Sequence, residues 1–268
     1  MIISHSHQFI FIKTKKTAGT SIEVYLSDLL GDGDVVTPVG VEEATASHRP
    51  RNFGGPFSPV GEALGLLTAP RRWKEIDGGG AIRSVGHAVK GKRFYNHISA
   101  YRVHRRVGRD LWSRYFTFAV ERNPWDKAIS QFYWKARRRP GYSFGEFVRE
   151  GDVGVNYPRY CHPRTGEVMV DRILYYDRLN EELAEVFKQV EVPFSGTLGV
   201  RAKGETRKDR KPYQELFSGE LAEHRPAIDA LFAKEIALHG WDFETGRARG
   251  TAGESGGAES SGPDGGGV

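Results

Sequence analysis

The chain has 268 residues, a formal net charge of +5 and 38% hydrophobic residues, which is enough for one sizeable α/β domain with its own core. Its one cysteine, Cys161, excludes an intrachain disulfide framework and a cysteine-rich zinc site, and we interpret the adjacent Cys161-His162 pair as packing or loop. The positive charge suits anionic ligands of any kind, nucleic acid included, so it does not choose among them.

The chain begins with MIISHSHQFIFI, which has no positively charged leader. This run continues directly into a candidate ligand loop, so we expect no cleaved targeting peptide. No stretch approaches the roughly twenty apolar residues that span a bilayer. The sequence therefore predicts a cytoplasmic protein without a membrane anchor.

The next segment predicts a buried strand, a turn and a helix. Phe9 to Ile12 are β-branched or aromatic, and an apolar helix start follows from Ile22. Backbone N–H groups in such a turn suit a phosphate, Gly19 lets an anion come close, and Lys16 adds a mobile charge. The hydroxyl donors are Thr17, Thr20 and Ser21. An ordinary turn with a solvated basic cluster is the alternative.

Neither Gly-Lys-Ser nor Gly-Lys-Thr occurs in the chain, so the turn is not a nucleoside-triphosphate P-loop. The stretch from Gly31 to Gly80 that follows is rich in glycine and proline and too long for a simple connection. An ordered lid or acceptor site and a disordered insert are both consistent with it. We expect a strand after Gly80, and His87 is compatible with that strand's register.

Residues Phe94 and Tyr95 predict another short strand, followed by His97 and a helix. Histidine suits proton transfer because its ordinary pKa lies near neutral pH. Taken alone, His97 fits a helix cap or a polar niche in the core better than a catalytic role. His87 and His104 compete with it for a catalytic role.

A second strand-to-helix junction resembles the first in its layout. Phe116 to Val120 predict a buried strand, and Arg122 follows at its end, where open α/β sheets bind ligands. Ser130 lies about two helical turns further on, so the two side chains are spaced to grip one phosphate. The helix start is marked by Asn123, Pro124 and Asp126.

That helix continues into QFYWKARRR, Gln131 to Arg139, a basic aromatic stretch of a kind that also binds nucleic acid. We favour an amphipathic helix whose positive C-terminal end complements the helix dipole. Its charges are also placed to line an acceptor site. We therefore expect no nucleic-acid partner.

The remaining segments complete an α/β pattern. Asp171 to Phe187 predict a strand and a scaffold helix, and Gln214 to Phe243 an amphipathic helix interrupted at Pro226. Residues 246–268 are rich in glycine and serine and predict a disordered tail. The sequence thus predicts one α/β domain over 1–245, with a central, mainly parallel sheet flanked by helices.

At two places the chain resembles the sulfotransferases that use 3′-phosphoadenosine-5′-phosphosulfate. Lys16 to Ser21, KTAGTS, resembles their 5′-phosphosulfate loop, and Arg122 to Ser130, RNPWDKAIS, resembles their 3′-phosphate motif. The likeness spans roughly residues 8 to 243 and is nearest to the branch with the heparan sulfate 2-O-sulfotransferases and related bacterial enzymes. Lys15 stands where that family usually has proline, and Lys127 where it often has arginine.

The resemblance implies a P-loop-like sulfotransferase fold, the phosphosulfate as co-substrate and no metal. It implies that Lys16 stabilises the departing phosphate and that His97, in a His-x-Ser pattern, takes the acceptor's proton. It also implies that the basic loop Gly204 to Tyr213 closes over the nucleotide. The implied cofactor-binding residues are Lys16, Thr17, Ala18, Gly19, Thr20, Ser21, Arg122, Ser130, Arg207, Arg210 and Lys211, with Lys208 a further candidate.

The acceptor stays open among a sugar hydroxyl, a phenol and a natural-product alcohol, and so does the oligomeric state. Two other classes of function are also open. A phosphate-transferring or NTP-hydrolysing enzyme predicts dependence on magnesium. A non-catalytic nucleotide- or polyanion-binding protein predicts that His97 is dispensable while the basic segments matter.

Overall fold

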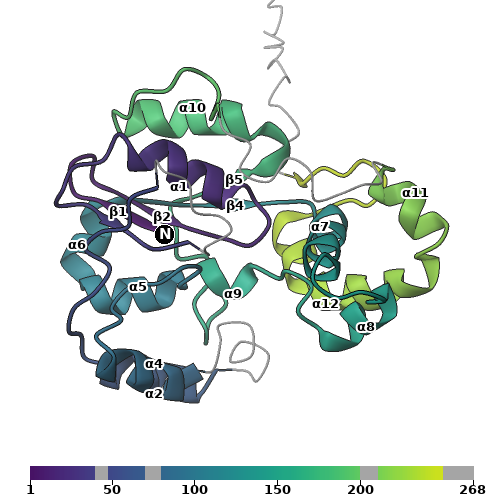
Figure 1. Cartoon of the computed structure of the whole chain (residues 1–268), viewed down its shortest axis with the longest axis horizontal. Helices are drawn as coiled ribbons and strands as arrows, with labels where there is room; N and C mark the ends of the chain where they lie inside the picture. The colour runs from purple at the N-terminus through teal and green to yellow at the C-terminus, as the bar shows by residue number, and fades with distance from the viewer. Residues whose placement is uncertain (40–47, 70–79, 200–210, 250–268) are drawn as a thin grey trace, which may run out of the picture.

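A five-stranded sheet forms the centre of the protein in a computed structural model that describes residues 1–39, 48–69, 80–199 and 211–249 (Figure 1). The strand order is β3-β1-β2-β4-β5. Strands β2, β4 and β5 run parallel, whereas β1 pairs antiparallel with β2 and β3. The strands are Ile2–Ser4 (β1), Phe9–Ile12 (β2), Val35–Val36 (β3), Phe116–Glu121 (β4) and Arg172–Tyr175 (β5). The predicted α/β class, with one mostly parallel sheet flanked by helices, is confirmed.

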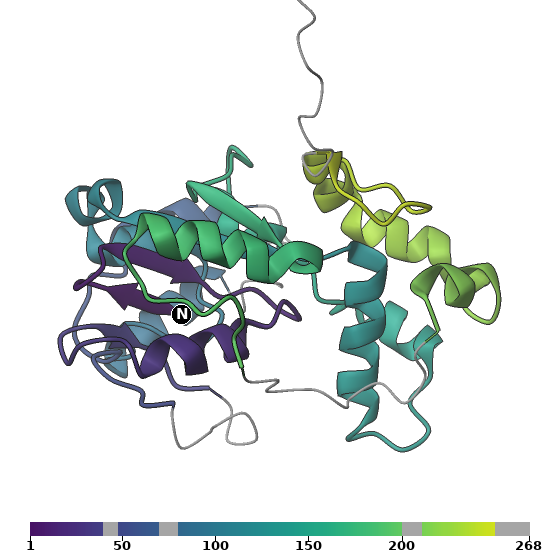
Figure 2. The same cartoon turned by 90° about the horizontal axis from the view of Figure 1, so that it is seen from above.

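Successive side chains of a strand point to opposite faces of the sheet, so the strands contribute to two hydrophobic cores, one on each face. Phe9 and Phe11 pack with α1 (Gly19–Ser27) and α10 (Leu179–Gln189). Ile10 and Ile12 pack on the opposite face. That face is covered by α5 (Ala100–Val107), α6 (Arg109–Arg114) and the short α9 (Tyr157–Tyr160), as Figures 1 and 2 show.

A helical lobe with its own core lies beside the sheet (Figure 2). It is built from α7 (Pro124–Ala136), α8 (Phe144–Glu150), α11 (Tyr213–Ser218), the 3₁₀ turn η3 (Ala222–His224) and α12 (Arg225–His239). Ala248 is buried in that core, and the Gly246 carbonyl accepts a hydrogen bond from Asn123. Residues 246–249 therefore pack on the lobe, and the rest of the expected tail lies outside the described residues.

Both strand-to-helix junctions lie where the sequence predicts them. Strand β2 is completely buried, and α1 begins at Gly19. At the second junction the side chain of Asn123 accepts hydrogen bonds from the backbone N–H groups of Trp125 and Asp126, both at 3.1 Å, with Pro124 at the first helical position. The predicted strand and helix after Asp171 are present as β5 and α10, joined by the 3₁₀ turn Tyr176–Arg178 (η2).

Four local predictions are wrong. Phe94 and Tyr95 are buried but form no strand; the Phe94 N–H donates to the Phe53 carbonyl. Gly80–Val89 forms helix α4, so His87 is helical. The basic aromatic helix ends at Ala136 and not at Arg139. The helix expected over Gln214 to Phe243 is interrupted, but at residues 219–221 and not at Pro226. Pro226 lies in the first turn of α12, where a proline leaves no hydrogen bond unmade.

The glycine- and proline-rich insert contains an ordered helix, α2 (Val60–Leu67). Its Glu62 is completely buried and accepts hydrogen bonds from Arg102 and Arg106 of α5 at 2.8–3.0 Å. Segments 40–47 and 70–79 of the insert lie outside the described residues. Within the described ranges, no helix combines the length and apolar character needed to cross a membrane.

Candidate active site

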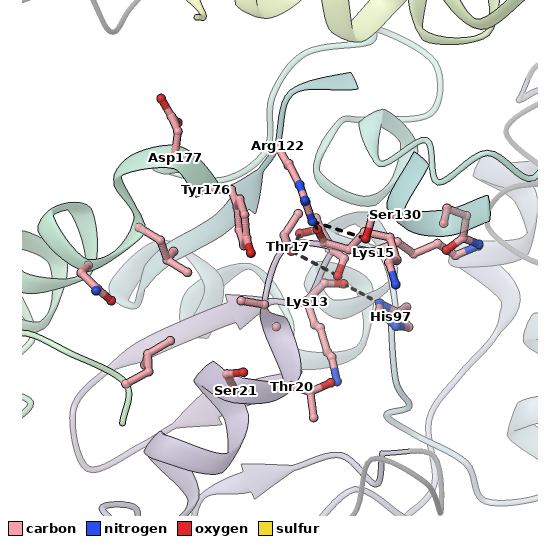
Figure 3. Close-up of a pocket in the computed structure, with 18 of the residues that line it drawn as sticks. Lys13, Lys15, Thr17, Thr20, Ser21, His97, Arg122, Ser130, Tyr176 and Asp177 are labelled. Atoms are coloured by element: carbon pink, nitrogen blue, oxygen red, sulfur yellow. Dashed lines mark hydrogen bonds between the residues drawn. The ribbon is translucent and has the colours of Figure 1, made fainter. Parts of the chain in front are cut away.

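A cavity of about 1280 Å³ opens at the carboxyl ends of β2 and β4 (Figure 3). Ligands of open α/β sheets bind at this end of parallel strands. The loop after β2, the start of α1, the end of β4 and one side of α7 supply its walls, together with η2, the start of α10 and residues 197–199. It contains nine of the residues predicted for the site: Lys16, Thr17, Ala18, Gly19, Thr20, Ser21, His97, Arg122 and Ser130.

The loop between β2 and α1 has an unusual backbone. Lys16 (φ 62°) and Ala18 (φ 59°) both occupy the left-handed region, which non-glycine residues rarely adopt. Ala18 is the N-cap of α1 and gives no side-chain cap. The first N–H groups of a helix have no carbonyl partner within the helix, so they suit an anion. Gly19, Thr20 and Ser21 place that helix start on the cavity wall.

Lys13 is a cavity residue that the sequence analysis missed. Its side chain is 2% exposed, and its Nζ lies 2.5 Å from Glu23 Oε2 in α1. Glu23 is fully buried and also accepts from the N-terminal ammonium of Met1. A lysine next to a buried strand, ten residues before a glutamate on an apolar helix face, was the available signal.

Gly19 is explained by Lys13. A Cβ at position 19 would lie 2.7 Å from Lys13 Cγ, closer than carbon atoms pack. The sequence pattern predicts that this glycine allows the close approach of an anion. The structure gives it a second reason, because the buried stem of Lys13 crosses directly over the helix start.

Arg122 connects the two junctions. Its Nη1 donates to the Lys16 carbonyl at 3.0 Å and lies 3.5 Å from Ser130 Oγ. Its Nε and Nη2 face Asp126 Oδ2 at 2.8 and 2.6 Å, and the guanidinium lies 4.3 Å from the centre of the Tyr176 ring. Arg122 and Ser130 thus sit side by side, as their spacing predicts, and reach the loop that carries Lys16.

His97 lines the same cavity from the segment before α5 (Figure 3). Its backbone is left-handed (φ 58°), and its Nδ1 lies 3.3 Å from the Lys13 carbonyl. A carbonyl only accepts, so Nδ1 carries the hydrogen and Nε2 keeps its lone pair. Burial, followed by the charges of Lys13, Arg159 and Lys15, holds the pKa of His97 well below its ordinary value of 6.5. The imidazole is therefore neutral at pH 7.

The other predicted residues lie elsewhere or are not described. Arg207, Lys208 and Arg210 fall in segment 200–210, outside the described residues. Lys211 stands before α11, 3.9 Å from Glu215, and is not among the described residues that line the cavity. His104 lines a separate hollow of about 380 Å³, and His87 lies on α4 with a pKa lowered to about 4 by burial and by Arg83.

Trp134, Gln131 and Asn96 also line the cavity and were not anticipated. Trp134 lies under Lys16, whose Nζ is 5.8 Å from the ring centre. Asn96 Oδ1 is buried without a partner among the described residues. Across those residues no group of three or more His, Cys, Asp or Glu could hold a metal ion.

Comparison with known proteins finds a relative by sequence and a solved structure of low similarity. No family model matches the chain. An uncharacterized protein of Archaeoglobus fulgidus is 37% identical over 101 residues, which are 36% of this chain and 84% of the relative. The chain belongs to the same sequence family as that archaeal protein, whose name gives no function.

A solved structure of a sulfotransferase from Alicyclobacillus acidocaldarius resembles the chain at 19% identity and a TM-score of 0.31, over 86% of this chain and 97% of that one. Both values are low. The residues of the cavity therefore carry the functional assignment.

Proposed function

We propose that this protein is a sulfotransferase that moves the sulfo group of 3′-phosphoadenosine-5′-phosphosulfate to a hydroxyl of a small-molecule or carbohydrate acceptor. One observation supports it above all. The two segments that resemble the phosphosulfate and 3′-phosphate motifs, about a hundred residues apart in sequence, line one cavity and touch through Arg122 and the Lys16 carbonyl.

The cavity suits a nucleotide with phosphates at both ends. The start of α1 and the hydroxyls of Thr17, Thr20 and Ser21 would hold the 5′-phosphate. Arg122 would hold the 3′-phosphate with Ser130, since a planar guanidinium and a hydroxyl together match phosphate oxygens. Asp126 and Tyr176 fix the guanidinium in place before any ligand arrives.

Sulfuryl transfer breaks the bond between sulfur and the bridging oxygen of the donor and forms one between sulfur and the acceptor oxygen. Negative charge then grows on the departing 5′-phosphate. By analogy with phosphoryl transfer, the protein positions the reactants and stabilises that charge. Lys16, which lines the cavity three residues before α1 begins, is the cation that would do so.

The acceptor hydroxyl must lose its proton to a base, and the hydrogen bonding of His97 suits that role. Its Nδ1–H donates a hydrogen bond to the Lys13 carbonyl, so Nε2 is the ring nitrogen that would receive the acceptor's proton. Burial, and after it the surrounding cations, holds the pKa of His97 below its ordinary value. An anionic donor would offset those cations and raise the pKa toward the range in which a general base works best.

The test compares ligands and then turnover. Adenosine 3′,5′-bisphosphate should raise the Tm more than ATP with magnesium does, and labelled phosphosulfate donor should label one member of a panel of sugar, phenol and alcohol acceptors. Stabilisation by ATP with magnesium alone would support a phosphate-transferring enzyme. Binding of the bisphosphate without transfer to any acceptor would support a non-catalytic binding protein.

A further inference from the structure

We infer that Asn156 is a positioning residue that clamps the 5′-phosphate loop through the backbone of Lys15. The inference rests on the proposed function. Asn156 is fully buried just before α9. Its Oδ1 accepts from the Lys15 N–H at 2.7 Å, and its Nδ2 donates to the Lys15 carbonyl at 3.0 Å. One amide therefore satisfies both backbone groups of a single residue.

Asn156 is itself held by a buried ionic cluster. Its backbone N–H donates to Glu235 of α12, and its Nδ2 lies 3.3 Å from Glu121 Oε1. Lys127 joins the two carboxylates, at 2.5 Å from Glu121 and 2.6 Å from Glu235. All three charged side chains are completely buried. The clamp thus rests on a rigid base that connects β4, α7 and α12.

The same cluster reaches the other phosphate region. Glu121 Oε1 accepts the backbone N–H of Arg122 at 2.8 Å. Glu121 therefore lies between Asn156, which holds the loop at Lys15, and Arg122, which holds the same loop at the Lys16 carbonyl. Two adjacent residues of the loop are fixed from one buried carboxylate.

The loop needs such a clamp because its backbone is costly to hold. Left-handed backbone is unfavourable for the non-glycine residues Lys16 and Ala18, and it persists only where neighbouring structure enforces it. Sulfotransferases usually have proline where this chain has Lys15, and proline stiffens a loop but has no N–H to donate. In this chain the Lys15 N–H and Asn156 supply the stiffness instead.

The main test is Asn156→Ala, with Tyr160→Phe as the matched control. Tyr160 is also fully buried and donates to Glu121 Oε2 at 2.8 Å, but among the hydrogen bonds of the described residues its side chain makes none to the loop. Asn156→Ala should weaken binding of adenosine 3′,5′-bisphosphate on the order of tenfold, the value of about one lost hydrogen bond, while 3′-AMP, which lacks the 5′-phosphate, changes less than about twofold. Tyr160→Phe should lower the Tm and leave both affinities unchanged.

A merely structural role would move both ligands together or leave both unchanged, and either result for Asn156→Ala overturns the inference. If the wild type binds no bisphosphate at all, the proposed function fails instead, so the two failures are distinct.

Hydrogen exchange covers the case in which Asn156→Ala does not fold. In the wild-type protein the Lys15 amide should exchange slowly although it lies outside any strand or helix.

A double-mutant cycle tests the same contact. Lys15→Pro removes the Lys15 N–H donor, so the loss of bisphosphate affinity caused by Asn156→Ala should shrink in a Lys15→Pro background. Fast exchange at Lys15, or strictly additive losses in the two variants, contradicts the clamp.

Discussion

The Nη1 atom of Arg122 lies 3.0 Å from the carbonyl oxygen of Lys16. This contact joins the end of β4 to the loop after β2, across 106 residues of sequence. It places the two predicted phosphate-binding segments at one cavity, and the predictions about the site follow from it.

Replacing Arg122 with alanine should weaken binding of adenosine 3′,5′-bisphosphate. Charge-assisted hydrogen bonds contribute about 1.5–3 kcal/mol, so Kd should rise by roughly 10- to 100-fold, measured by calorimetry. Arg122→Lys keeps the charge and loses the planar fork, and should recover only part of the affinity. Binding of 5′-AMP, which has no 3′-phosphate, should weaken less, because only the contact of Arg122 with the Lys16 carbonyl is lost for it; an equal loss for both ligands would contradict the assignment.

Replacing His97 with alanine should lower kcat by roughly a hundredfold to ten-thousandfold, the usual value of general-base assistance, with the bisphosphate Kd changed less than about threefold. Steady-state kinetics with the acceptor found in the transfer assay measures this. His104→Ala is the control, because His104 lines the separate hollow. Near wild-type kcat in His97→Ala would falsify the role of the base.

Replacing Lys16 with alanine should also reduce kcat more than donor affinity. The ammonium group is proposed to act on charge that grows during transfer, and such interactions are expressed in the rate. Comparing kcat with the bisphosphate Kd separates the two effects. A pure loss of binding, with kcat unchanged at saturating donor, would show that Lys16 only anchors the nucleotide.

Gly19→Ala should destabilise the protein, since the new Cβ would meet Lys13 Cγ at 2.7 Å. Overpacking of this kind costs about 1–3 kcal/mol, to be measured by urea unfolding. Gly33→Ala is the control, because a Cβ there meets nothing within 4 Å. Equal stabilities of the two variants would show that the Lys13 stem moves aside at little cost.

Acid should unfold the protein partly through His87. Its pKa is lowered to about 4, and a group that the folded state keeps deprotonated destabilises the fold once the unfolded state begins to bind its proton. The free energy of unfolding should therefore fall as the pH drops from about 6.5 toward 4, and less steeply in His87→Phe. Parallel stability curves for the two proteins across that range would contradict this.

The sequence alone was sufficient for features set by neighbouring residues. Four consecutive apolar residues predict strand β2. The N-cap residue Asn123, followed by Pro124, predicts the start of α7. The spacing of Arg122 and Ser130 followed from helical periodicity. The sequence wrongly predicts strands at Phe94-Tyr95 and after Gly80, where the structure has no strand and helix α4, respectively. Short-range strand preference is weak and depends on tertiary context.

Only the tertiary structure decided which distant groups meet. The ion pair of Lys13 with Glu23, the hydrogen bond from His97 to the Lys13 carbonyl and the clamp of Asn156 on Lys15 join residues 10, 84 and 141 positions apart. Periodicity reports which face of an element is buried, but not which partner lies across it. The chain's local chemistry therefore indicates where the candidate phosphate loop lies, and the packing of helices around the sheet determines which histidine, lysine and asparagine surround that loop.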